Sequence, residues 1–365
     1  MKKISKKICS VVMTILLGCV ALTGCDENKQ EATGQTETTQ QTEAAEQTEA
    51  VEQTESMVDD VELEDVVVRI GGMSGPTSMG MVKLMEDAEN SETEVKYEFA
   101  ELSTDPAAFV APLSKGEIDI AAVPSNLASV LYNKTEKGIS VLAINTLGVL
   151  NIVERGDTVK QISDLAGKTV YATGEGATPE YTLRYVLNQA GLDADKDVTI
   201  RWCADTTEAL SYVSADESAI AMLPQPFVTA ALAQVEGLRV AIDMNEAWSD
   251  TEAGKNGSSI VTGVVVVRNE FLESYPNTVA KFLEEYNASI NYVNENTEEA
   301  ANLIEKYGIV AKAAIAMKAL PECHITYIDG QEMKESLSAY LDILFEANPQ
   351  AVGGNVPGDD FYYGL

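Results

Sequence analysis

Short apolar runs alternate with helix-periodic segments along the chain beyond residue 60. The runs are about five residues long and rich in Val, Ile and Leu, and apolar residues at helical spacing separate them. This alternation is typical of βα units, in which helices pack on a largely parallel sheet. The runs that we expect to form strands are 66–70, 95–99, 118–123, 139–146, 149–154, 168–172, 198–202, 218–223, 239–242 and 259–267.

Helical patterns follow these runs, and three long ones come last. Met81, Leu84, Met85 and Ala88 fall at i, i+3, i+4 and i+7, which places them on one helix face. Apolar stripes at 279–293, 303–307 and 337–344 predict C-terminal helices that cover a sheet and hold no cofactor. About 300 residues remain from position 61, a length that suits two domains.

The first 24 residues are typical of a signal peptide. Four lysines at positions 2, 3, 6 and 7 precede an apolar run over 8–22, which is shorter than the roughly 20 residues of a membrane-spanning helix. The run ends in Leu22-Thr23-Gly24-Cys25, which resembles the lipobox of bacterial lipoproteins. The resemblance implies that Cys25 becomes the first mature residue and carries lipid, including palmitate. The alternative is a short buried helix with an unrelated cysteine.

Residues 25–60 predict a disordered acidic spacer. Positions 26–60 hold eleven acids, one lysine and no aromatic residue, and Gln-Thr-Glu recurs every six residues from position 35. No register buries an apolar face, so the segment should stay disordered and extended. We expect a tether that lifts the folded part off a membrane. A helical or adhesive role for the repeat is the alternative.

Net charge limits the partners of the chain. The whole chain carries −33, and loss of the four leader lysines makes the remainder four units more negative. Nucleic-acid binding depends on lysine and arginine neutralising phosphates, so no nucleic-acid partner is expected. The charge suits a soluble body that does not adhere to an anionic membrane surface.

The residues that carry most enzyme chemistry are sparse. His324 is the only histidine, which excludes a site with several histidine ligands and leaves a histidine-based triad dependent on one residue. Its neighbours Cys323 and Ile325 suggest no catalytic partner, so we expect a structural or surface role. Beyond Cys25, we expect Cys203 and Cys323 to be separate thiols, although a disulfide is permitted outside the cell. We therefore expect no catalytic residue, metal or cofactor.

Several segments resemble solute-binding proteins of ABC importers. They are 159–170, which contains Asp164-Leu165-Ala166-Gly167-Lys168, then 181–192, 205–210 and 219–226. The resemblance is to the nitrate, sulfonate, taurine and thiamine-precursor branch and covers roughly 66–344. It implies an α/β, two-lobe periplasmic-binding-protein-like fold of type II. Each lobe would be a mixed, mostly parallel sheet flanked by helices, with two hinge crossings between the lobes.

The same resemblance divides the folded part into three stretches. The crossings fall near 149–157 and 259–267. Residues 61–157 would then form the first part of lobe 1, 158–258 lobe 2, and 259–365 the return to lobe 1 with the C-terminal helices. Two lobes on a hinge can close around a solute.

Candidate ligand contacts lie in turns between strands and helices. Ligands of such sheets sit at strand C-ends against helix N-termini, where N–H groups, hydroxyls and amides converge. The expected contacts are Met73, Ser74, Gly75, Thr77, Ser78, Ser125, Asn126, Asn145, Gly176, Ala177, Thr178, Gln225 and Thr262. Alternatively, 71–76 is an ordinary glycine turn and Thr178 only caps its helix, ahead of Pro179. Trp202 either stacks on a ligand ring or packs within its lobe.

The predicted loops contain no arginine, which leaves the charge of the ligand open. A sulfonate or nitrate would rely on helix ends and hydroxyls, and a neutral heterocycle fits equally well. We expect a monomeric, extracytoplasmic lipoprotein, anchored to the cell membrane through Cys25 only, that captures one small solute for ABC permease subunits. The alternatives are a lipoprotein that senses a ligand for a membrane receptor, or a secreted enzyme. Related pyrimidine-synthesising enzymes use a cysteine-rich motif, and this sequence has no cysteine cluster.

Overall fold

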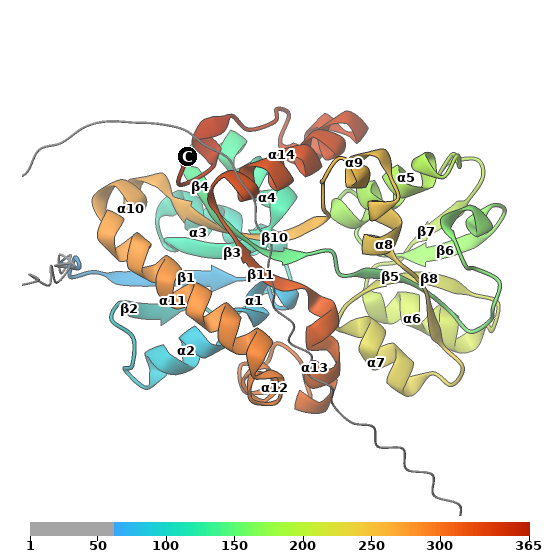
Figure 1. Ribbon diagram of the computed structural model, residues 1–365, viewed down its shortest axis with the longest axis horizontal. Helices are drawn as coiled ribbons and strands as arrows, with labels where there is room; N and C mark the ends of the chain where they lie inside the picture. Colours follow the sequence, from blue (N-terminus) through green and yellow to red (C-terminus); the bar gives the residue numbers. More distant parts are fainter. Residues whose placement is uncertain (1–61) are drawn as a thin grey trace, which may run out of the picture. The chain divides into compact units, whose positions relative to one another are not determined.

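The computed structural model describes residues 62–365, which form two β-sheets flanked by helices (Figure 1). The predicted signal peptide, Cys25 and the acidic spacer lie outside the described residues. The predicted α/β fold class is confirmed. Among the helices of residues 62–365, none combines the length and the apolarity that a bilayer crossing requires.

The first sheet has six strands in the order β11-β4-β10-β3-β1-β2. Its strands are β1 (Val67–Gly72), β2 (Lys96–Phe99), β3 (Ile120–Pro124), β4 (Ile139–Leu147), β10 (Val261–Arg268) and β11 (Ile325–Ile328). β1 pairs in parallel with β2 and β3, whereas β10 is antiparallel to β3 and β4, and β11 is antiparallel to β4. Buried Val and Ile side chains on both faces of the central strands explain why these runs read as nearly continuous apolar segments.

The second sheet has five strands in the order β7-β6-β8-β5-β9. They are β5 (Leu150–Glu154), β6 (Thr169–Ala172), β7 (Thr199–Trp202), β8 (Ile220–Pro224) and β9 (Arg239–Asp243). β6 is parallel to β7 and β8, and β5 is antiparallel to β8 and β9. Both sheets are mixed as predicted. Four of the six strands in the first sheet and four of the five in the second run in one direction, as predicted for mostly parallel sheets. The strands that oppose this direction are β10 and β11 in the first sheet and β5 in the second.

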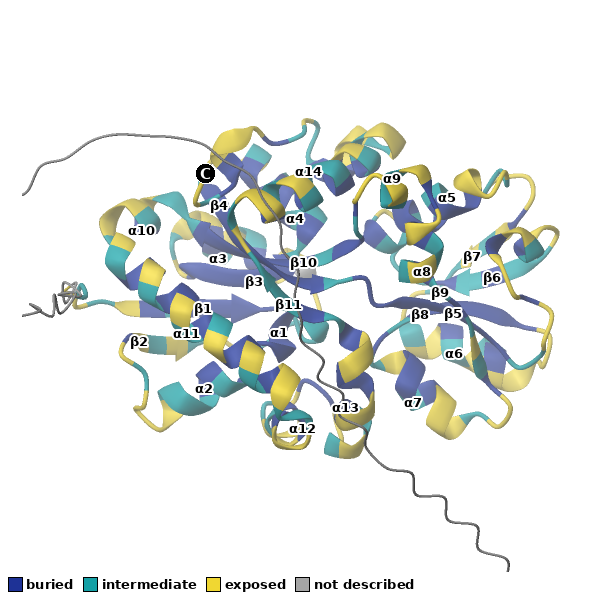
Figure 2. Cartoon of the chain, viewed as in Figure 1, coloured by how far each residue is buried: buried dark blue, intermediate teal, exposed yellow. Residues whose placement is uncertain are grey.

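Helices cover the sheets, and each helix buries the side that faces its sheet. In Figure 2 the central strands are buried, while helices such as α11 and α7 show exposed residues on their outer sides. The helices are α1 (Pro76–Met79), α2 (Val82–Glu89), α3 (Val110–Lys115), α4 (Ser125–Lys134), α5 (Thr178–Gln189), α6 (Thr206–Ala215), α7 (Phe227–Gln234), α8 (Met244–Ser249), α9 (Glu252–Lys255), α10 (Asn269–Ser274), α11 (Pro276–Glu295), α12 (Thr297–Lys306), α13 (Ala313–Ala319) and α14 (Gly330–Ala347). Short 3₁₀ turns lie at Pro106–Phe109, Ile162–Leu165, Leu320–Cys323, Pro349–Val352 and Asp359–Phe361.

The chain passes from the first sheet to the second at Gly148 and Val149, and returns between β9 and β10 through α8 and α9. The carbonyl oxygen of Gly148 accepts hydrogen bonds from Asn245 Nδ2 at 3.0 Å and from His324 Nδ1 at 2.7 Å. A side chain at Gly148 would collide with Asn245 Oδ1. His324 therefore holds the crossing between the sheets, and its role here is structural.

Candidate ligand site

A cavity of about 210 Å³ lies where elements of the two sheets face each other. Prolines, other apolar side chains, hydroxyls and one amide form its wall, with no charged side chain among them in the part of the chain that the structure describes. Such a mostly apolar hollow with a few polar groups is typical of small-molecule sites. It is lined by Met73, Ser74, Gly75, Pro76, Thr77, Pro124, Val149, Leu150, Thr178, Pro179, Thr182, Pro224, Gln225, Pro226, Phe227, Ile260, Thr262 and Tyr340.

The turn between β1 and α1 forms one side of this cavity. Gly75 has φ of 136°, a conformation that residues with a side chain rarely adopt. The N–H of Met73 donates to Ala122 O at 3.0 Å, and the N–H of Ser74 donates to Ser103 O at 2.8 Å. These two backbone hydrogen bonds, to Ala122 of β3 and to Ser103, hold the turn in place.

Gln225 closes the opposite side at the end of β8. Its backbone N–H donates to Val149 O at 2.8 Å, and its Oε1 accepts from Thr229 Oγ1 at 2.8 Å and Thr229 N at 3.3 Å. Gln225 Nε2 has no hydrogen-bond partner in the part of the chain that the structure describes. The peptide bond between Gln225 and Pro226 is cis, and Phe227 follows with 45% of its side chain exposed.

The start of α5 and the middle of α14 complete the wall. Thr182 Oγ1 and Tyr340 Oη are hydrogen bonded at 2.8 Å, and both residues are fully buried. Burial raises the pKa of Tyr340, so the phenol keeps its proton at neutral pH. Within the first turn of α5, Glu180 Oε2 accepts from Gly176 N at 2.7 Å, and Glu180 Oε1 accepts from Arg184 Nε at 2.7 Å.

Some of the residues predicted to contact a ligand line this one cavity. The predicted residues that line it are Met73, Ser74, Gly75, Thr77, Thr178, Gln225 and Thr262. They come from turns or strand ends far apart in the sequence, on both sheets. Their contact with a ligand stays a prediction.

Three other predicted residues, Ser125, Asn126 and Asn145, lie outside the cavity wall and form hydrogen bonds within the fold. Ser125 Oγ donates to Val261 O at 2.6 Å, and Asn126 Nδ2 donates to Ala351 O at 3.3 Å. Asn145 Nδ2 donates to Thr77 O at 2.9 Å and Tyr286 Oη at 3.1 Å, so it supports the β1–α1 turn from behind.

Three further predicted residues lie near the cavity but not on its wall. Ser78 is fully buried, and its Oγ has no hydrogen-bond partner among the described residues. Gly176 and Ala177 precede α5, where Ala177 occupies the N-cap position that the sequence predicts for Thr178. Thr178 is instead the first helical residue, with its side chain on the cavity.

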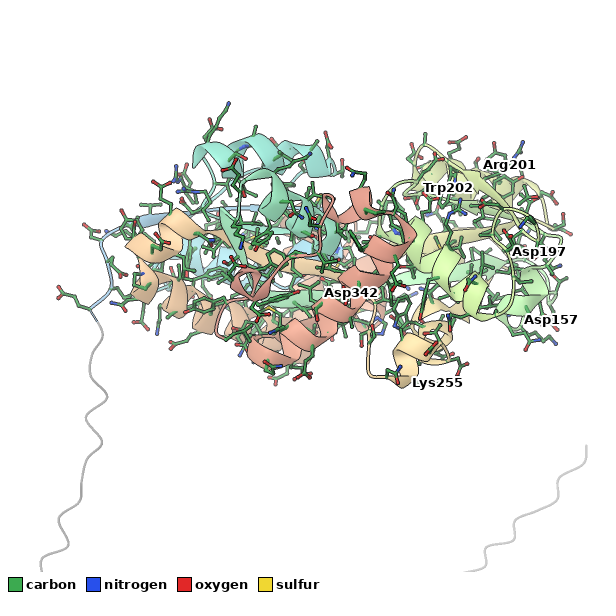
Figure 3. All side chains as sticks on the ribbon, turned by 90° about the horizontal axis from the view of Figure 1, so that it is seen from above. Asp157, Asp197, Arg201, Trp202, Lys255 and Asp342 are labelled. Carbon is green, nitrogen blue, oxygen red and sulfur yellow. The ribbon has the colours of Figure 1, made fainter. Side chains whose placement is uncertain are left out.

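Trp202 lies on β7, the edge strand of the second sheet, away from the cavity wall (Figure 3). Its half-buried ring packs against the main apolar cluster. The structure therefore supports packing of Trp202 within its lobe rather than stacking on a ligand ring.

Sequence reasoning missed Phe227, Thr182 and Tyr340 on the cavity wall. The signal for Phe227 was its place directly after Gln225-Pro226, at the end of a strand. Tyr340 belongs to an apolar helical stripe that predicts ordinary core. Only the contact between α14 and α5 brings it to the cavity.

Among residues 62–365 no cluster of three or more His, Cys, Asp or Glu could hold a metal ion. Cys203 and Cys323 are both free thiols. Burial raises the pKa of Cys323 to about 12, and burial also raises the pKa of Cys203. Both thiols are protonated at neutral pH and are poor nucleophiles.

Comparison with known proteins identifies a matching family profile and similar folds. A sequence profile of the NMT1-like family matches residues 77–306. The structure is similar to an ABC transporter protein from Parabacteroides distasonis, with a TM-score of 0.67 and 25% identity over 82% of this chain and 99% of that chain. No curated protein sequence matches the chain.

Two sulfonate-binding proteins share the fold. The periplasmic aliphatic sulphonate binding protein SsuA from Escherichia coli has a TM-score of 0.63 and 18% identity, covering 82% of this chain and 96% of its own. The alkanesulfonate-binding protein SsuA from Xanthomonas axonopodis pv. citri, bound to MOPS, has a TM-score of 0.58 and 14% identity, covering 81% and 96%. At these identities the likeness concerns the fold.

Proposed function

The chain belongs to the NMT1-like family, and from this premise we propose that it is the extracytoplasmic solute-binding protein of an ABC importer. It captures one small organic molecule in the cavity between its two sheets and delivers that molecule, chemically unchanged, to permease subunits. The similar ABC transporter protein from Parabacteroides distasonis supports this assignment.

The observation that carries the proposal is a cavity whose wall comes from both sheets. Met73 and Thr262 belong to the first sheet or its turns, and Gln225 and Thr178 to the second sheet or its turns. Within residues 62–365 two chain passages join the sheets, so a rotation about them changes the width of the cavity. A solute that contacts both walls favours the closed arrangement.

We further propose that the sheets correspond to two lobes and that the folded part is held at the membrane. Lobe 1 then comprises about 62–148 and 259–365, and lobe 2 about 149–258. The boundary expected at 157 is too late, because β5 at Leu150–Glu154 pairs with β8 and β9 in the second sheet. Lipid on Cys25 and the spacer at 26–60 would keep the protein, as a monomer, near its permease. Several acyl chains are needed for stable anchoring, since one gives only marginal binding.

A thermal-shift screen tests the function. A solute present at 100 times its Kd stabilises the folded state by about 2.7 kcal/mol, which raises the Tm by several degrees. Thr262→Trp fills the cavity and should abolish the shift. Thr199→Trp, on the exposed side of β7, is the matched control and should retain it. If sulfonates, oxyanions, amino acids and heterocycles all leave the Tm unchanged, the proposed function is wrong.

A further inference from the structure

The charge of the solute can be inferred from the donors around the cavity. Proteins that lack a cationic side chain at an anion site bind the anion through free N–H groups of loops and helix starts. In the β1–α1 turn, the N–H groups of Met73 and Ser74 are already bonded to carbonyl oxygens. The N–H of Ser78 likewise donates to Gly75 O at 3.1 Å. The backbone N–H groups of Gly75 and Thr77 are the ones in this turn that keep no partner among the described residues, so an anion would meet main-chain donors here but no cation.

Prolines remove further donors at the helix starts that meet the cavity. Pro76 is the first residue of α1, and Pro179 is the second residue of α5. Pro124 directly precedes α4, and Pro226 directly precedes α7. All four line the cavity. Proline has no N–H group, so each of these positions presents ring carbons where another residue would offer a donor.

A carboxylate, paired with Arg184, already lies at the positive end of α5. Glu180, in the first turn of this twelve-residue helix, accepts the N–H of Gly176 and stays next to the N-terminus. A carboxylate at this place compensates the helix dipole that would attract an anionic ligand. The protein as a whole carries −33, which lowers the local concentration of anions further.

The polar groups that remain suit an uncharged molecule. Gln225 Nε2 is a neutral donor held in place through Oε1. The hydroxyls of Ser74, Thr178 and Thr262 also line the cavity. Phe227 adds an exposed aromatic face at the same site. A cavity of about 150 Å³ accommodates benzene in another protein, so 210 Å³ has room for a substituted single ring.

On the basis of the proposed function, we propose that this cavity selects an uncharged, largely apolar small molecule with a hydrogen-bond acceptor that meets Gln225 Nε2. It discriminates against sulfonates and other organic anions. Binding an anion here would strip its water without supplying a cationic side chain, which is unfavourable.

Matched pairs of probes that share a carbon framework test this inference. Aryl and alkyl carboxamides are compared with the corresponding carboxylates, and sulfonamides with sulfonates, by calorimetry and thermal shift at pH 7.5 on the whole folded chain. The uncharged member should bind at least tenfold more tightly in the pairs that bind. Gln225→Leu, which keeps the size but removes the donor, should weaken carboxamide binding about tenfold.

A cation placed in the cavity should reverse the preference. Thr262→Arg should bind the sulfonate or carboxylate member more tightly than the uncharged one, whereas Thr199→Arg, outside the cavity, should keep the original order. Tighter binding of anions by the unmodified protein would overturn the inference and leave the proposed function standing. Binding of neither member of any pair would overturn the inference, and failure of the wider solute screen would overturn the function as well.

Discussion

At the scale of single residues, a buried carboxylate fixes the end of β5. Glu154 is 2% exposed and accepts hydrogen bonds from Thr158 N at 2.8 Å, Thr158 Oγ1 at 2.8 Å and Val159 N at 3.0 Å. Arg239 also pairs with it. Burial by itself would raise the pKa of Glu154, but these hydrogen bonds outweigh it and hold the pKa below the usual 4.5.

The depressed pKa of Glu154 predicts a pH-dependent stability. A carboxylate with a lowered folded-state pKa stabilises the fold above its unfolded pKa, and the stabilisation disappears as the pH falls through the folded value. Glu154→Gln should therefore cost about 2 kcal/mol at pH 7. The difference from the unmodified protein should stay constant while the pH remains well above 4.5 and narrow as the pH falls below 4.5 toward the lower folded-state pKa. Urea unfolding at each pH measures it.

An exposed ion pair provides the control for Glu154. Glu217 is 84% exposed and pairs with Arg155 at 3.2 Å. Glu217→Gln should leave the stability unchanged across the same pH range, because surface pairs contribute little. A cost of Glu154→Gln that stays constant as the pH falls well below 4.5 would contradict the assignment of the charged form as the stabilising one.

Polar residues near strand ends have one of two roles, and the sequence alone cannot distinguish them. Ser125 and Asn145 satisfy backbone groups inside the first sheet, whereas Gln225 and Thr262 reach the cavity. All four are polar residues near strand ends. Which role each takes depends on the neighbour that folding brings, such as Val261 O for Ser125.

At the scale of elements, α14 links the first sheet to the helix that follows β6. It packs on α4, β4 and β10 and also touches α5, and Tyr340 Oη bonds Thr182 Oγ1 in the wall of the cavity. Asn348 Nδ2, just after the helix, donates to Tyr181 Oη at 2.9 Å. These contacts give the cavity a wall that spans both sheets.

A double-mutant cycle tests this link. Tyr340→Phe leaves Thr182 without its partner, and Thr182→Val leaves the Tyr340 hydroxyl unpaired, so each change should cost about 1–3 kcal/mol of unfolding free energy. Changing both removes the two buried polar groups together and should cost clearly less than the sum. Denaturant unfolding of the four proteins measures the coupling. If the costs of the two single changes add up in the double variant, the hydrogen bond between Tyr340 and Thr182 contributes nothing to the stability.

Helices and strands with a strong hydrophobic pattern could be predicted from the sequence, and those without such a pattern could not. The valine-rich strand predicted at 259–267 is β10 at Val261–Arg268. The helix α7, Phe227–Gln234, is apolar around most of its circumference and has no period to detect. β11 has four residues, too few for an alternation, and the helix α9 is equally short. The cavity depends on how two sheets face each other, which no local pattern encodes.

At the scale of the whole molecule, we propose that an acidic solute-binding part is held at a membrane by lipid on Cys25. The charge of −33 keeps the body soluble and apart from an anionic bilayer. Retention at the membrane then depends on Cys25, which lies outside the described residues.

Replacing the anchoring cysteine tests that dependence. Cys25→Ser, expressed in a bacterial host, should abolish incorporation of labelled palmitate and move the protein from the membrane fraction to the soluble fraction. Cys19→Ser, in the apolar run of the same leader, is the matched control and should remain lipidated. Membrane retention of the Cys25→Ser protein with its label intact would contradict lipid attachment at this residue.

The central claim is that one small solute binds, chemically unchanged, between the two sheets. Its most direct test is a crystal structure of the protein purified without unfolding, after soaking with the strongest hit from the solute screen. The account predicts density for the intact, uncharged solute beside Met73, Gln225 and Phe227. Solute density outside this cavity, or a reaction product within it, would contradict the account.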